Sequence, residues 1–150
     1  MMNETTLEKN LAETGIHVST TVGWSMYPML RNRRDRIVLT AIGDKVLKKY
    51  DLPLYRLPNG KFVLHRILKV CDGYYVIRGD NTYRLERVPF SWVQGYVTEF
   101  YRGKKHYSVD SRAYRFYISF WRFLYPIRYV VVGAKRFAGR VYRKLFKKKK

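Results

Sequence analysis

The sequence predicts a mostly β fold, a small, coiled antiparallel sheet or partly open barrel, with helices at both ends. From residue 16 to residue 100, short runs of β-branched and aromatic residues alternate with Gly, Pro and Asp. After residue 102, Arg recurs at near-helical spacing among aromatic and aliphatic residues. The chain has 150 residues, 47% of them hydrophobic, which is enough for one domain with a buried core.

The first fifteen residues predict a short amphipathic helix. Thr5 and Glu8 fit a capping box, Leu7 and Leu11 form one apolar stripe, and Gly15 fits the end of a helix. This segment is polar and lacks an apolar stretch of seven residues. We therefore expect neither a secretory signal peptide nor an N-terminal membrane anchor.

The second predicted segment, residues 16–102, contains five strand patterns. They lie at residues 17–22, 36–40, 62–70, 74–78 and 92–100. Asp72-Gly73 between two of these runs predicts a hairpin, and Gly95 predicts a bulge in the last. Cys71 is the only cysteine, so the chain cannot form an intramolecular disulfide.

The third predicted segment, residues 103–150, is a basic, aromatic, helical tail. Residues 101–150 hold sixteen Lys or Arg and one acid, Asp110, so most of the net charge of +20 lies here. Pro126 predicts a break into two helices. Arg122 and Arg128 disfavour a membrane-spanning helix over residues 116–134.

An interfacial helix on an anionic membrane fits the tail better than a spanning one. The alternatives are that its aromatic faces pack on the domain or that its charges bind nucleic acid. We expect peripheral contact of residues 107–150 with an anionic membrane surface, and no specific nucleic-acid partner.

Four residues carry the chemistry of a nucleophile, a base and the group that orients the base. Ser25 supplies a hydroxyl, His65 an imidazole expected in the middle of a strand, and Asp80 or Glu86 a carboxylate. A serine hydroxyl is a weak nucleophile by itself, whereas imidazole titrates in the range that a general base needs. Each residue alone also has an ordinary structural interpretation.

Five segments together resemble the S24/S26 serine peptidases, the group that contains type I signal peptidases and self-cleaving LexA-like repressors. They are residues 23–30 (Gly-Trp-Ser-Met-Tyr-Pro-Met-Leu), 34–39, 63–67 (Val-Leu-His-Arg-Ile), 75–81 (ending in Gly-Asp-Asn) and 93–97. The resemblance covers about residues 16–100 and implies a fold of that peptidase type, Ser25 as nucleophile and His65 as base. Most bacterial members have a lysine at the base position, so His65 is similar to the endoplasmic-reticulum and archaeal branch.

The resemblance leaves the third catalytic residue open between Asp80 and Glu86, with Asp80 preferred. Gly23 stands where signal peptidases commonly have a serine that helps the oxyanion hole. The hole must then use backbone N–H groups such as that of Ser25, and we expect Gly23, Met26 and Pro28 at the substrate and oxyanion positions.

The predicted function is that of a serine endopeptidase that cleaves a leader or signal-like peptide, with a peptide or protein as substrate. We expect neither a cofactor nor a metal ion. The expected location is peripheral on a membrane or in the cytoplasm. The alternative is a non-catalytic basic module that binds an anionic membrane or nucleic acid.

Overall fold

The chain divides into two compact units, Met1–Tyr114 and Arg115–Lys150. The computed structural model describes the backbone of residues 4–146 and the side chains of residues 6–130. Residues 1–3 and 147–150, the outer ends of the predicted N-terminal helix and tail, lie outside this description. The first unit extends past residue 102 because one more strand and the start of the last helix belong to it.

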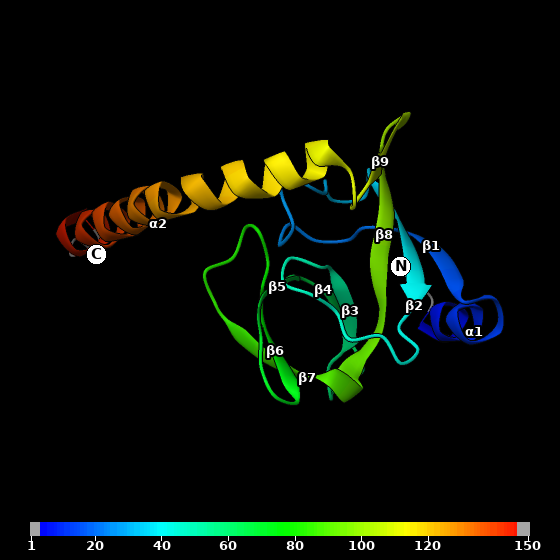
Figure 1. Cartoon of the computed structure of the whole chain (residues 1–150). Helices are drawn as coiled ribbons and strands as arrows, with labels where there is room; N and C mark the ends of the chain where they lie inside the picture. The colour runs from blue at the N-terminus through cyan, green and yellow to red at the C-terminus, as the bar shows by residue number, and fades with distance from the viewer. Residues whose placement is uncertain (1–3, 147–150) are drawn as a thin grey trace. The chain divides into compact units, whose positions relative to one another are not determined.

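The first unit is mostly β, as predicted, and its larger sheet is curled (Figure 1). This six-stranded antiparallel sheet has the order β1-β2-β8-β3-β4, and β9 also pairs with β8. Its strands are β1 Ile16–Thr20, β2 Arg36–Ala41, β3 Pro53–Arg56, β4 Phe62–Leu64, β8 Val93–Arg102 and β9 Lys105–Ser108. The order leaves β1 and β4 as the two ends of the curled path.

The smaller sheet is an antiparallel meander of three strands in the order β5-β6-β7. Its strands are β5 Arg66–Val70, β6 Tyr74–Arg78 and β7 Glu86–Pro89, and the 3₁₀ turn η1 Phe90–Trp92 leads from it into β8. The predicted hairpin joins β5 to β6, with Gly73 at a φ of +75° that favours glycine.

One apolar core joins the two sheets. Its members come from β3 and β8 of the larger sheet, from all three strands of the smaller one, and from the loop before β3: Leu47, Tyr55, Ile67, Tyr75, Ile77, Val88 and Val93. The backbone N–H of Leu47 donates to the buried Tyr75 hydroxyl at 2.9 Å. The sheets therefore hold each other in place through burial of apolar surface.

The predicted strand over residues 62–70 is wrong as a single element. It breaks at His65, where the chain leaves the larger sheet and enters the smaller one. β4 pairs with β3, whereas β5 pairs with β6, so the two halves have different partners. His65 therefore lies at the junction of the sheets and is buried there.

Gly95 is needed for close approach of two strands. A Cβ at this position would lie 2.7 Å from the Thr40 carbonyl oxygen. The irregularity in β8 falls beside Gly95, because Leu54 pairs with Gly95 whereas Tyr55 pairs with Val93.

The N-terminal helix α1 spans Glu4–Thr14 and buries Leu7 and Leu11, as the apolar stripe predicted. Gly15 follows it at a φ of +71°. The capping box at Thr5 is wrong, because the helix has already begun at Glu4. Glu8 instead accepts a hydrogen bond from Arg56 of β3 at 2.7 Å.

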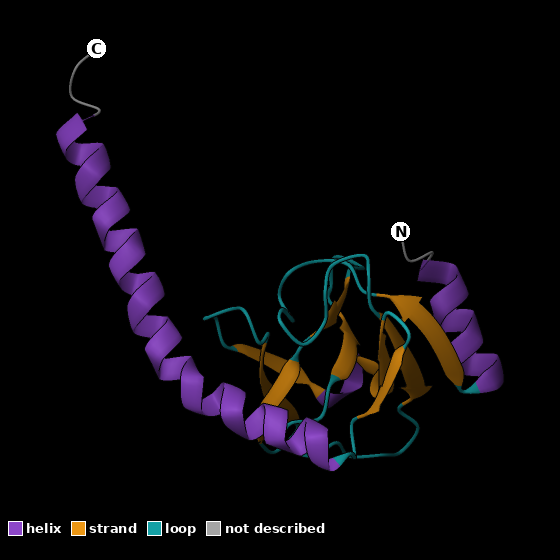
Figure 2. Cartoon of the chain, turned by 90° about the horizontal axis from the view of Figure 1, so that it is seen from above, coloured by secondary structure: helices purple, strands orange, loops and turns teal. Residues whose placement is uncertain are grey.

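The last helix, α2, spans Arg112–Phe146 without interruption, so the predicted break at Pro126 is wrong (Figure 2). Proline removes one helical hydrogen bond and crowds the preceding turn, but a long helix can continue past it with a distortion. Within the described residues, no helix has both the length and the apolar character needed to cross a membrane.

Candidate active site

Ser25 lies in the turn that follows β1 and lines a pocket of about 280 Å³. The pocket wall combines the end of β1 and the turn after it with side chains of β2, β3 and β4. Its lining residues are Thr20, Thr21, Val22, Gly23, Ser25, Met26, Leu30, Ile37, Leu54, Phe62, Val63 and Leu64. Ser25 therefore lies beside a mainly apolar pocket between the two ends of the curled sheet.

The His65 ring and the backbone of Ser25 both lie close to Gly79, in the loop after β6. A Cβ placed on Gly79 would lie 2.7 Å from the Ser25 carbonyl oxygen and 3.0 Å from His65 Nε2. Both atoms are thus within 3.0 Å of one point, and the missing side chain is what lets them approach. The structure brings together two residues that are forty positions apart in the sequence.

The loop after β6 also holds the Ser25 turn through its backbone. Asn81 N–H donates to the Ser25 carbonyl oxygen at 2.7 Å, and the Asn81 side-chain amide donates to the Trp24 carbonyl oxygen at 3.1 Å. The Gly-Asp-Asn segment therefore positions the nucleophile candidate as well as the base candidate.

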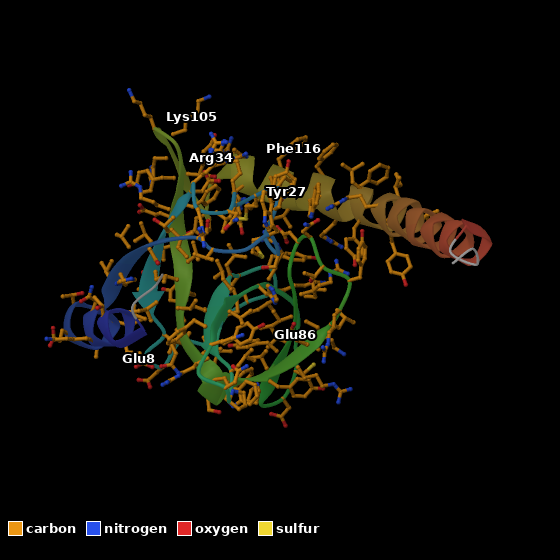
Figure 3. The ribbon with its side chains drawn as sticks, turned by 180° about the vertical axis from the view of Figure 1, so that it is seen from behind. Glu8, Tyr27, Arg34, Glu86, Lys105 and Phe116 are labelled. Carbon is orange, nitrogen blue, oxygen red and sulfur yellow. The ribbon has the colours of Figure 1, made fainter. Side chains whose placement is uncertain are left out.

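The other ring nitrogen of His65 contacts Tyr55 and, beyond it, Glu86. The Tyr55 hydroxyl donates to Glu86 Oε2 at 2.6 Å and lies 3.1 Å from His65 Nδ1. Glu86 Oε2 itself is 3.7 Å from Nδ1, which is too long for a direct hydrogen bond. Figure 3 labels Glu86, which begins β7.

This arrangement fixes the tautomer of His65. Tyr55 has one hydroxyl hydrogen and gives it to Glu86, so Nδ1 must be the donor in the contact with the Tyr55 oxygen. In the neutral imidazole Nε2 then carries the free lone pair, and Nε2 is the nitrogen that lies next to Gly79. This tautomer leaves Nε2 able to accept a proton, as a general base must.

Burial sets the protonation states of this group. Desolvation lowers the pKa of His65 below its ordinary value of 6.5, although the negative charges of Glu86 and Asp80 oppose the effect. Desolvation and the hydrogen bond to Glu86 raise the pKa of Tyr55 well above its usual range. At neutral pH the imidazole is therefore neutral and the phenol keeps its proton.

Asp80, the preferred third member in the sequence prediction, makes a bidentate ion pair with Arg66. Arg66 Nε and Nη2 each donate to one Asp80 oxygen at 2.7 Å, and both side chains are only 4% exposed. The Asp80 carboxylate thus neutralises a buried guanidinium, while its charge still acts on His65 from a distance. Glu86, not Asp80, lies on the Nδ1 side of the His65 ring, and the Tyr55 hydroxyl bridges the two.

Arg66 is the centre of a buried polar network. Besides Asp80, its guanidinium donates to the Tyr114 hydroxyl at 2.6 Å and to the Tyr50 carbonyl oxygen at 3.2 Å. Burial alone would lower the pKa of Arg66, but its charge interactions and hydrogen bonds with Asp80 and Tyr114 together outweigh burial, and the pKa is raised. Because Arg66 follows His65 and Asp80 follows Gly79, this network links the backbone next to the base with the loop that carries Gly79.

The three residues predicted for substrate and oxyanion contacts are placed differently. Gly23 and Met26 line the pocket, and Gly23 has a φ of +106° that suits glycine. Pro28 lies half-buried in the same turn but is not one of the lining residues. The structure thus brings Gly23 and Met26, but not Pro28, to the hollow beside Ser25.

Tyr55 is the residue that sequence reasoning missed. It lies in the short strand β3, is fully buried, and has no motif around it that signals a role. Gly79 was included in a motif, but its contacts with both Ser25 and His65 follow only from the fold. Among the residues whose side chains are described, no group of three or more His, Cys, Asp or Glu side chains could hold a metal ion.

No model of a protein family matches the sequence, and no curated protein matches it.

Proposed function

We propose that the protein is a serine endopeptidase with Ser25 as nucleophile and His65 as general base. The observation that carries the proposal is that the backbone of Ser25 and His65 Nε2 both lie close to Gly79, with Nδ1 held on the opposite side of the ring. A nucleophile, a base and a group that orients the base form the minimal apparatus for acyl transfer. The resemblance to S24/S26 peptidases over about residues 16–100 supports the same assignment.

In the proposed reaction, Ser25 Oγ attacks the carbonyl carbon of a peptide bond while His65 Nε2 takes the hydroxyl proton. The backbone N–H of Ser25 donates to the oxyanion. The imidazolium then gives its proton to the leaving amine, which breaks the C–N bond and leaves an acyl-enzyme. Water, deprotonated by the same imidazole, hydrolyses this ester and restores Ser25.

Within this proposal, Glu86 is the third member and acts through Tyr55. When His65 becomes positive, the Glu86 carboxylate stabilises that charge across the Tyr55 hydroxyl. Asp80 has a supporting role, because its ion pair with Arg66 holds the loop that carries Gly79. Asp80 also adds a favourable negative charge at longer range.

The pocket supports a peptide substrate in extended conformation. Thr20 of β1 and Phe62, Val63 and Leu64 of β4 line it, and these two strands form the ends of the curled sheet path. End strands offer unpaired backbone groups to an added strand. A mainly apolar hollow of about 280 Å³ suits small uncharged side chains, as the resemblance implies for residues before the scissile bond.

The test is digestion of a mixed peptide library by the full chain, with new amino termini mapped by mass spectrometry. We expect cleavage after small residues by the native protein and none by Ser25→Ala or His65→Ala. Ser91→Ala, which removes an exposed hydroxyl from η1, is the matched control and should cut normally. Cleavage by Ser25→Ala at the native rate, or no cleavage by any variant including the native chain, would refute the proposal.

A further inference from the structure

Helix α2 carries an exposed apolar stripe on its described part. Phe116, Phe120, Phe123, Ile127 and Val130 are each between 51% and 73% exposed. Their spacing of four, three, four and three residues places all five on one face of the helix. The label in Figure 3 marks Phe116, near the start of this stripe.

The charged residues of the helix are all cations. Residues 112–146 contain nine Lys or Arg and no Asp or Glu. At 100° per residue, Arg115, Arg122 and Arg128 lie at least 80° away from the line through the stripe. Arg128 stacks over Trp121, with its guanidinium carbon 4.3 Å from the ring centroid. The helix thus has one exposed apolar face, and all the charges in its sequence are positive.

We expect the exposed apolar face of α2 to be covered by another molecule. Isolated helices gain most of their stability when an apolar face is covered, and an exposed row of three phenylalanines is unfavourable in water. A second copy of the same helix is a poor partner, because every charge beside the stripe would face another positive charge. The phosphates of a nucleic acid would pair with the positive charges, but they would leave the row of apolar side chains exposed to water.

We propose that α2 lies along the surface of an anionic lipid bilayer, with the stripe from Phe116 to Val130 in the acyl boundary. An apolar face combined with a Lys- and Arg-rich polar face is what such interfacial helices use. The Lys and Arg side chains then contact headgroups with a net negative charge, which are absent from a neutral bilayer. This inference does not depend on the proposed catalytic activity.

The experiment is co-sedimentation of the full chain with vesicles of phosphatidylcholine alone and of phosphatidylcholine with phosphatidylserine. We expect binding to the anionic vesicles to be at least about tenfold stronger than to the neutral ones and to weaken in high salt. Phe116→Ser combined with Phe123→Ser should weaken it by at least about tenfold.

Two control variants test whether the loss of vesicle binding is specific to the apolar stripe of α2. Val46→Ser combined with Val70→Ser removes exposed apolar side chains outside α2 and should leave vesicle binding unchanged. Ser25→Ala should also bind like the native chain, so failure of the peptidase proposal would not affect this result.

Three outcomes would overturn the inference. The first is equal binding to neutral and anionic vesicles, or none to either. The second is a dimer in sedimentation without lipid that the phenylalanine substitutions dissociate. The third is binding to duplex DNA that persists in the presence of excess anionic vesicles.

Discussion

At the scale of single residues, the hydrogen bonds around His65 give its two nitrogens different tasks. Tyr55 holds Nδ1 as a donor because its own proton goes to Glu86, so the lone pair lies on Nε2, the nitrogen beside Gly79. Burial keeps the ring neutral at pH 7 because it lowers the pKa below 6.5. A base of this kind loses activity only when the pH falls through its lowered pKa.

The first prediction concerns Glu86→Gln and the pH dependence of acylation. Glu86 raises the pKa of His65 against the effect of burial, so its neutralisation should lower that pKa further. The acidic limb of the labelling rate by a serine-reactive probe should therefore move to lower pH. The plateau rate should fall by about tenfold or more because the imidazolium loses its counter-charge. A limb that moves to higher pH would contradict the role of Glu86.

The second prediction concerns the hydroxyl of Tyr55. Tyr55→Phe keeps the buried ring but leaves Nδ1 without its acceptor, so the tautomer is no longer fixed. We expect the plateau labelling rate to fall by about tenfold or more. Tyr75→Phe removes another buried hydroxyl, one that accepts from Leu47, and should change only stability. Equal labelling rates in the two variants would remove Tyr55 from the mechanism.

The third prediction separates the two carboxylates by stability. Asp80→Asn leaves the Arg66 guanidinium buried without its counter-ion, which should reduce the free energy of unfolding by about 3–5 kcal/mol. Glu86 is 32% exposed, so Glu86→Gln should have a clearly smaller effect. Urea unfolding of both variants measures the difference. If Glu86→Gln is the more destabilising change, the structural role assigned to Asp80 is wrong.

At the scale of elements, sequence patterns correctly predicted most of the helices, strands and turns that depend on residues near one another in the chain. The apolar stripe of α1, the β2 run and the Asp-Gly hairpin between β5 and β6 all follow from residues near in sequence. The break at His65 could not be predicted in this way, because residues 62–70 read as one continuous run. Only the pairing partners of β4 and β5, which come from distant segments, divide it.

The fourth prediction tests the contact between the loop after β6 and the site. In Gly79→Ala, the new Cβ would clash with the Ser25 carbonyl oxygen and press on His65 Nε2. We expect the labelling rate to fall on the order of 10²-fold, since small displacements of reacting groups are costly. Gly103→Ala, at a φ of +63° with open space around it, should lower stability by about 1 kcal/mol and leave the rate unchanged. Native rates in Gly79→Ala would contradict the arrangement.

At the scale of the whole molecule, the curled sheet explains why the site lies where it does. The path from β1 through β2, β8 and β3 to β4 brings its two ends to the same pocket. The sequence motifs predicted Ser25, His65 and both carboxylates as candidates and preferred Asp80 to Glu86 as the third member, whereas the contacts favour Glu86. That ranking depends on Arg66 and Tyr55, whose contacts exist only once both sheets have assembled.

The central claim is that Ser25 becomes acylated with the help of His65. The most direct measurement is mass-spectrometric mapping of the adduct formed by a serine-reactive acylating probe on the full chain at neutral pH. We expect a single adduct on the peptide that contains Ser25, its absence in Ser25→Ala, and a rate reduced by about 10²-fold or more in His65→Ala. Equal labelling of the native chain and both variants, or an adduct located elsewhere, would contradict the account.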